Sequence, residues 1–225
     1  MAKTDLYECM KTLRAVRRLR PDPIPPDVLH RVLDAARWAP TGGNRQPWRM
    51  IVVRDERNKE RLAELYRGPW QAYAAHHRKL LESARPEAAE RQERMLRAGD
   101  YLAENFERSP VLVVFCFNPK EMAITDAGLD RPSVVGGGSV YTAVENLLLA
   151  CRAEGLGCTL TTLLCSCEDE VRSLLEIPDP WYTAAVIPIG YPLHRGHGPI
   201  RRRPLEQLAF GETWGTTFED GTGES

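Results

Sequence analysis

The chain contains 225 residues, and its 30 Lys and Arg against 31 Asp and Glu leave a formal net charge of −1 at pH 7. This balance gives no bulk attraction to nucleic acid or to an anionic membrane surface, so the composition argues against both classes of partner. Hydrophobic residues make up 43% of the chain and no apolar run approaches the ~20 residues of a membrane-spanning helix, so a globular protein is expected.

The cysteines and the N-terminus bear on the cellular compartment. The six cysteines include no CxxC pair, and Cys165 and Cys167 stand too close together for a zinc knuckle. The opening residues MAKTD carry no apolar signal segment. The sequence therefore predicts a cytoplasmic protein without a disulfide framework.

The first part of the chain alternates helical and extended patterns. In chain order we predict a short helix running into a basic cluster over 4–19, an extended proline-rich connection over 21–26, a helix over 27–38, a loop over 40–44, a buried strand over 48–53 and a helix over 55–66. The helix over 27–38 has apolar residues at helical spacing, and Pro26 suits its first turn.

Residues 68–108 form a charged, alanine-rich segment with a helical pattern that Pro86 interrupts. Aromatic residues and leucines such as Trp70, Tyr73 and Leu102 fall on one side of it. We interpret the segment as a helical insertion that forms an arm or lid outside the main core.

The second part of the chain contains three extended patterns. In chain order we predict a central strand over 111–117, a loop over 119–133, a helix over 140–153 preceded by glycines, a short strand over 159–164, a helix over 168–175, a strand over 184–189, a basic segment over 199–204 and a flexible tail over 215–225. With no internal repeat, the pattern predicts an α+β fold in a single domain, 1–225.

Catalytic groups supplied by the protein are sparse in this sequence. The five histidines form no metal-binding pattern, and there is no GxSxG elbow, Walker loop or GxGxxG motif after a strand. We therefore assign no catalytic residue and no metal ligand. Two arginine clusters stand out instead, at 14–20 and 201–203. Arginine forks suit phosphate, and solvated surface charge is the other interpretation of the same pattern.

Two stretches near the N-terminus resemble the nitroreductase family of flavoproteins. They are RAVRRLRPDPIP from Arg14 and AARWAPTGGNRQPW from Ala35. That family opens with an arginine-rich turn, an IPxxxLxxxLxxA helix and an APSxxNxQPW loop, whose serine is Thr41 here. The segments 146–157 and 177–192 and the RRPLE run from Arg202 resemble later parts of the family, so the likeness extends from about Thr12 to Trp214.

The resemblance implies a nitroreductase-like fold, with a mixed, mostly antiparallel sheet flanked by helices, and a homodimer with two sites for non-covalent flavin mononucleotide (FMN) at its interface. It assigns the phosphate and ribityl chain to Arg14, Ala15, Arg17 and Arg202, with Arg203 or Arg201 as substitutes in the triple run. It assigns contacts from the other subunit to Pro40, Thr41, Gly42, Asn44 and Gln46. Thr161, Thr162 and Leu163 would lie along the flavin ring.

The implied activity is that of an oxidoreductase that passes hydride from NADH or NADPH through the flavin to a nitroaromatic or quinone in a ping-pong cycle. A flavin supplies the redox chemistry itself, which agrees with the lack of protein-borne acids and bases. Flavin fragmentation, dehalogenation or dehydrogenation on the same fold is a second hypothesis, and a flavin-binding protein without turnover is a third.

Overall fold

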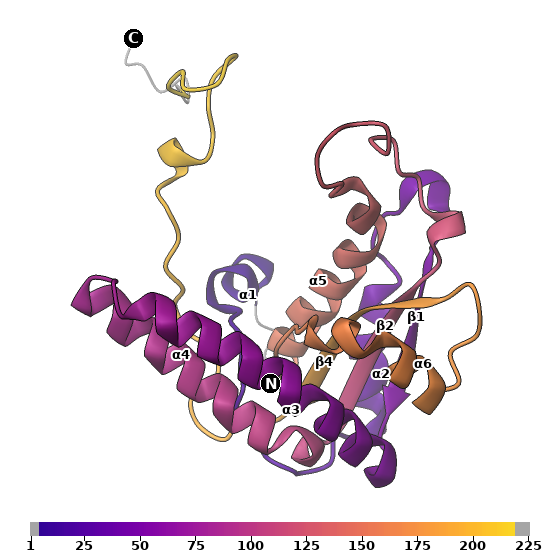
Figure 1. The fold of residues 1–225 in the computed structure, drawn as a ribbon. Coiled ribbons are helices and arrows are strands. Elements are labelled where there is room, and N and C mark those ends of the chain that lie inside the picture. Colours follow the sequence, from indigo (N-terminus) through magenta and orange to yellow (C-terminus); the bar gives the residue numbers. More distant parts are fainter. Residues whose placement is uncertain (1–4, 219–225) are drawn as a thin grey trace.

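A four-stranded antiparallel sheet forms the centre of the protein, whose structure, a computed structural model, describes residues 5–218 (Figure 1). The strand order is β1-β2-β4-β3. The strands are β1 (Trp48–Val53), β2 (Val111–Phe117), β3 (Gly157–Cys158) and β4 (Tyr182–Gly190). The strands predicted over 48–53, 111–117 and 184–189 are therefore confirmed, and the sheet agrees with the predicted nitroreductase-like fold.

Helices cover both faces of this sheet. They are α1 (Leu6–Thr12), α2 (Pro26–Ala36), α3 (Glu56–Leu81), α4 (Pro86–Glu104), α5 (Gly138–Ala153) and α6 (Glu168–Leu174). On β2, Val113 and Phe115 pack in one core cluster with α2 and α5, whereas Leu112 and Val114 pack in a second cluster with α3, α4 and α6. This alternation explains the continuous apolar run of β2, because side chains of a strand buried on both faces have no polar side to present. Within the described residues, no helix is long and apolar enough to cross a membrane.

The N-terminal helix is short and ends before the arginine cluster, as predicted. Asp5 caps α1 by accepting a hydrogen bond from the Tyr7 amide, and the helix ends at Thr12. From Leu13 the chain is extended, and the Val16 amide donates to the Cys158 carbonyl over 2.8 Å. Pairing with β3 therefore fixes the extended conformation of the arginine cluster.

The helix predicted over 55–66 runs on through Pro69 as the 26-residue α3. A proline inside a helix leaves the carbonyl four residues earlier without its amide donor. Here that carbonyl belongs to Leu65, and the Cys167 thiol donates to it over 3.8 Å. The thiol from the neighbouring 3₁₀ turn replaces the missing donor, so α3 carries its aromatic residues on one continuous helix.

The segment predicted as an arm is a helical hairpin whose inner part belongs to the core, which corrects the interpretation that it lies outside. Trp70, Leu96 and Leu102 are buried in the second core cluster, where they pack with the sheet. Pro86 begins α4, as the interruption in the pattern predicted. The Trp70 ring lies directly against Gly99, and its Nε1 donates to Asp100 over 2.9 Å.

The strand predicted over 159–164 is displaced. The paired residues are Gly157 and Cys158, and within 159–164 the structure has only an isolated bridge between Thr161 and Val186 before a 3₁₀ turn at 163–167. A Cβ on Gly157 would lie 2.7 Å from Val16 Cγ1, so glycine is required where the N-terminal segment crosses the strand. Of the predicted flexible tail, 219–225 lie outside the described residues, whereas Thr217 forms a bridge with Phe210.

Replacing Gly99 by alanine is expected to lower the free energy of unfolding by about 1–3 kcal/mol, measured by urea denaturation. The new Cβ would lie 2.0 Å from the Trp70 ring, so the hairpin must separate or the ring must move. The matched control is Gly68→Ala in α3, where a Cβ meets nothing within 4 Å. Helix propensity alone predicts a gain of up to about 1 kcal/mol at both positions, so a stabilised Gly99→Ala would contradict this packing.

Candidate functional site

Residues 12–20 are hydrogen-bonded through their backbone to two other segments of the chain. The Val16 amide donates to the Cys158 carbonyl of β3. The Arg20 amide donates to the Tyr191 carbonyl over 2.8 Å, and the Leu193 amide donates to the Arg18 carbonyl over 2.9 Å. The apolar side chains of Val16 and Leu19 are buried, whereas most of the arginines between and around them point outward. Val16 is buried while Arg14 and Ala15 are exposed.

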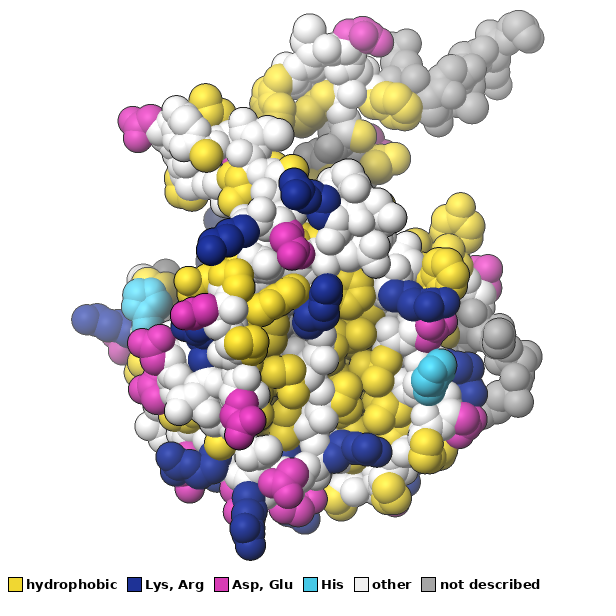
Figure 2. All heavy atoms as spheres, turned by 90° about the vertical axis from the view of Figure 1, so that its right-hand side faces the viewer, with side chains coloured by type: hydrophobic (Ala, Val, Ile, Leu, Met, Phe, Trp, Pro, Cys, Tyr) yellow, Lys and Arg dark blue, Asp and Glu magenta, His cyan; other side chains and the backbone are white. Residues whose placement is uncertain are grey.

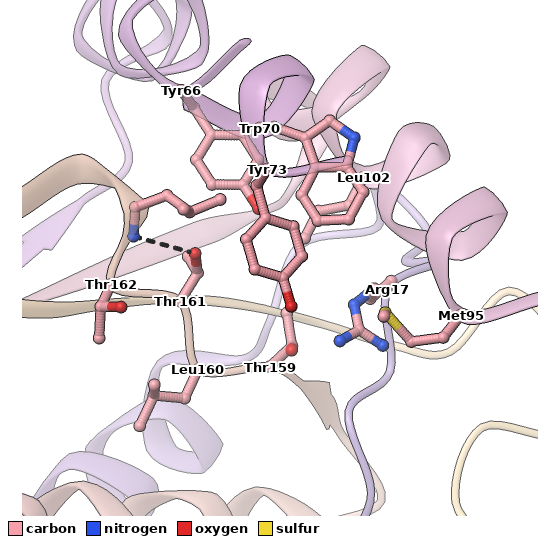
Figure 3. A pocket seen from close by; sticks show the side chains of 11 residues that line it. Arg17, Tyr66, Trp70, Tyr73, Met95, Leu102, Thr159, Leu160, Thr161 and Thr162 are labelled. Carbon is pink, nitrogen blue, oxygen red and sulfur yellow. Dashed lines mark hydrogen bonds between the residues drawn. The ribbon is translucent and has the colours of Figure 1, made fainter. Parts of the chain in front are cut away.

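A cavity of about 180 Å³ lies between this segment and α3. Its lining residues are Arg17, Tyr66, Trp70, Tyr73, Met95, Leu102, Thr159, Leu160, Thr161, Thr162 and Leu163. Figure 3 shows the three aromatic rings from α3 gathered above the Thr159–Thr162 stretch, with the Arg17 guanidinium beside Met95. Four residues that the sequence assigned to the flavin therefore line one cavity: Arg17, Thr161, Thr162 and Leu163.

The Arg17 guanidinium has no carboxylate within ion-pair distance among the described residues, although it is half-buried. Burial lowers its pKa below the usual range, because desolvation disfavours the charged form. Burial also raises the pKa of Tyr66. A hydrogen bond with Thr161 and the charge of Arg17 lower this pKa, but they only partly offset the effect of burial. An anionic ligand in the cavity would stabilise the charged form of this partly desolvated guanidinium.

The loop over residues 40–46 is fixed against the start of α5 rather than at this cavity. The Gly42 amide donates to Ser139 Oγ over 3.0 Å, and the Gln46 amide donates to Thr41 Oγ1 over 3.1 Å. Asn44 and Gln46 have φ of 54° and 50°, in the left-handed region. None of the residues from 40 to 46 lines the cavity that contains Arg17.

The second arginine cluster lies on a C-terminal segment that runs away from the body of the chain (Figure 1). Arg202 and Arg203 are exposed, and Arg202 Nη1 donates only to the neighbouring Arg201 carbonyl among the described residues. Within one chain, the structure therefore does not bring either arginine to the cavity of Arg17.

Sequence reasoning missed the aromatic wall of the cavity. Tyr66, Trp70 and Tyr73 are spaced so that they share one helix face, and this spacing was the available signal. The signal was divided because the helix over 55–66 and the segment over 68–108 were predicted as separate elements, with Tyr66 in the first and Trp70 and Tyr73 in the second. One continuous helix places all three rings on the same face.

Comparison with known proteins identifies the class. The model of the nitroreductase family matches residues 10–191. An NADH dehydrogenase of Thermus thermophilus is 30% identical over 197 residues, which cover 88% of this chain and 91% of the relative. The chain belongs to the nitroreductase family, which confirms the resemblance carried by the N-terminal motifs and makes the protein a flavin-type oxidoreductase.

Three further comparisons, with one sequence relative and two solved structures, show proteins similar to this chain. Iodotyrosine deiodinase 1 of Rattus norvegicus is 26% identical over 221 residues, which cover 92% of this chain and 70% of the relative. A crystal structure of oxidized iodotyrosine deiodinase bound to FMN and 3-iodo-L-tyrosine has a TM-score of 0.62 and 25% identity, and covers 89% of this chain and 94% of its own. A putative NADH dehydrogenase/NAD(P)H nitroreductase of Parabacteroides distasonis has the same fold, with a TM-score of 0.65, 20% identity and coverage of 93% and 99%.

Replacing Ser139 by alanine is expected to raise the exchange rate of the Gly42 amide about fivefold, because one hydrogen bond is worth about 1 kcal/mol. The measurement is hydrogen–deuterium exchange across residues 40–46. The control is Ser173→Ala at an exposed position of α6, which should leave that exchange unchanged. Equal exchange in both variants would show that Ser139 does not hold the loop.

Proposed function

We propose that the protein is an FMN-dependent oxidoreductase that takes hydride from NADH or NADPH and reduces an electron-poor acceptor such as a nitroaromatic or quinone. The observation that carries this proposal is the half-buried Arg17, without an ion-pair partner among the described residues, in a cavity beside Thr161, Thr162 and Leu163. The FMN-bound deiodinase with the same fold supports the choice of flavin.

The residues of the cavity suit FMN by their charge and by the chemistry of their side chains. A phosphate near pH 7 carries about 1.5 to 2 negative charges, and Arg17 with the exposed Arg14 and the Ala15 amide would hold it. Thr161 and Thr162 offer hydroxyls and backbone groups along a planar ring, and the aromatic side chains of α3 offer an apolar wall. When bound, the isoalloxazine ring accepts and releases hydride, so the chain need only bind, orient and shield the reactants.

The acceptor is expected to be planar and to carry no positive charge. Tyr66, Trp70 and Tyr73 can stack an aromatic acceptor and exclude water from it. Arg17 is the sole charged side chain among the residues that line the cavity, so a cationic group there would lack a counter-ion. This argument favours a quinone or nitroaromatic over a zwitterionic amino acid.

Reductive dehalogenation of a halotyrosine is the second candidate function, because the iodotyrosine deiodinases cover most of this chain at 25–26% identity. The residues that line the cavity include no carboxylate, which weighs against dehalogenation of a halotyrosine, because the ammonium group of this amino acid would be desolvated without an ion-pair partner. Release of iodide from 3-iodo-L-tyrosine by the reduced protein, at a rate above that of quinone reduction, would favour this candidate instead.

A homodimer completes the proposed site. Residues 40–46 and the arginines at 202 and 203 do not line the cavity of their own chain, so we propose that the partner copy supplies them. The C-terminal segment exposes Leu205, Leu208 and Trp214, the last at 92%. Figure 2 shows hydrophobic side chains gathered at the centre of one face, with charged side chains around them. Apolar surface of this kind is typical of obligate interfaces.

Arg17→Ala is expected to weaken FMN binding about 10- to 150-fold, because charge-assisted hydrogen bonds to phosphate are worth roughly 1.5–3 kcal/mol. Titration of the apoprotein by flavin fluorescence measures this. The urea stability of the apoprotein should not fall, since the removed cation is partly buried without an ion-pair partner. Arg91→Ala, at an exposed position of α4, is the control. Normal FMN affinity in Arg17→Ala would contradict the phosphate assignment.

The purified protein is expected to oxidise NADH or NADPH only when a quinone or nitroaromatic is present, and to sediment at about twice its chain mass of 25.4 kDa. Steady-state kinetics with varied acceptor should give the parallel lines of a ping-pong cycle. A flavin-binding protein without turnover would hold FMN but oxidise no nicotinamide. A monomer that binds FMN and turns over fully would contradict the shared site.

A further inference from the structure

His197 joins three segments of the chain directly behind Arg14. Its Nε2 donates to the Leu156 carbonyl over 2.8 Å, and its Nδ1 accepts from the Arg14 amide over 3.5 Å. Leu156 lies between α5 and β3, and His197 lies in the loop that follows β4. A donor at Nε2 and an acceptor at Nδ1 describe one neutral tautomer, so this arrangement requires the uncharged ring.

The residues on either side of His197 also hold the arginine segment. Arg14 Nε donates to the Gly196 carbonyl over 2.7 Å, and the Gly198 amide donates to the Thr12 carbonyl over 3.1 Å. The loop over 196–198 is therefore hydrogen-bonded both to the backbone of Thr12 and to the guanidinium of Arg14. His197 is the side chain that ties this loop to the α5–β3 connection.

The charged groups that face the His197 ring are both cationic. They are Arg14 on the extended segment and Arg152 on α5, whose Nε donates to Thr12 Oγ1 over 2.8 Å. Burial lowers the pKa of His197, the two arginines lower it further, and the hydrogen bond to Leu156 acts in the opposite direction. A second proton on the ring would place an N–H at Nδ1 against the Arg14 amide.

We propose that His197 is a positioning residue for Arg14, and that its protonation loosens the hold of the chain on the flavin phosphate as the pH falls. This inference rests on the proposed FMN site. The folded-state pKa of His197 is lowered, so the neutral ring contributes fully to the free energy of unfolding above the unfolded-state pKa of about 6.5. This contribution is lost as the pH falls through the folded-state pKa, where the ring takes up its second proton.

The test compares FMN dissociation constants at pH 8.0 and pH 5.5 in wild type and two variants. His197→Asn keeps an acceptor for the Arg14 amide but does not titrate. We therefore expect its FMN affinity to lie within about twofold of wild type at pH 8.0 and to be about fivefold tighter than that of wild type at pH 5.5. His197→Phe keeps neither hydrogen bond and should bind about fivefold more weakly at pH 8.0. Titration of the FMN phosphate is common to all three proteins and cancels in the ratios.

A control and a second measurement separate the possible failures. His194→Asn changes an exposed histidine of the same loop and should retain the wild-type pH dependence. In the apoprotein, exchange of the Arg14 amide relative to the Val16 amide should accelerate at pH 5.5 in wild type but not in His197→Asn. Parallel pH curves for FMN binding in wild type and His197→Asn would overturn the inference, with or without the change in amide exchange. Absence of FMN binding at pH 8.0 in wild type would overturn the proposed function itself.

Discussion

Backbone hydrogen bonds from residues 12–20 to two segments far away in sequence are the constraint on which the candidate site depends. A segment with four arginines repels itself and is well solvated, so an isolated peptide would have little reason to stay extended. Pairing with β3 and with residues 191–198 satisfies its backbone, and burial of Val16 and Leu19 fixes which side chains face outward. The position of Arg17 in its cavity follows from this register.

The opposite wall of the cavity depends on α3 remaining one helix. Pro69 removes an amide donor in the middle of α3, and the Cys167 thiol donates a hydrogen bond to the Leu65 carbonyl in its place. Trp70 then packs on Gly99 and bonds to Asp100, which holds α4 against the same face. The cavity is thus enclosed by a helical hairpin on one side and by an edge of the sheet on the other.

Charge is distributed unevenly over the proposed site. Arg17 lines the cavity as its one charged side chain, while Arg202 and Arg203 lie on the segment that leaves the body of the chain. His197 adds a ring that accepts a hydrogen bond from the Arg14 amide, and burial together with the facing Arg152 and Arg14 lowers its pKa. A site with this excess of positive charge is stable when an anion is bound, which agrees with a flavin phosphate.

The sequence by itself determined the family, the three main strands and the residues around the cavity that come from short local motifs. The arginine-rich turn, the proline-bounded helix and the fully apolar strand over 111–117 each have a local physical cause. The tertiary structure decided the extended pairing of residues 13–20, the continuity of α3 through Pro69, the aromatic wall and the hydrogen bonds of His197. Each of these depends on a partner far away in sequence: Cys158 for Val16, Cys167 for Leu65, and Leu156 for His197. Local periodicity carries no information on such partners, because a backbone group is satisfied equally well by a distant donor or acceptor as by its own helix.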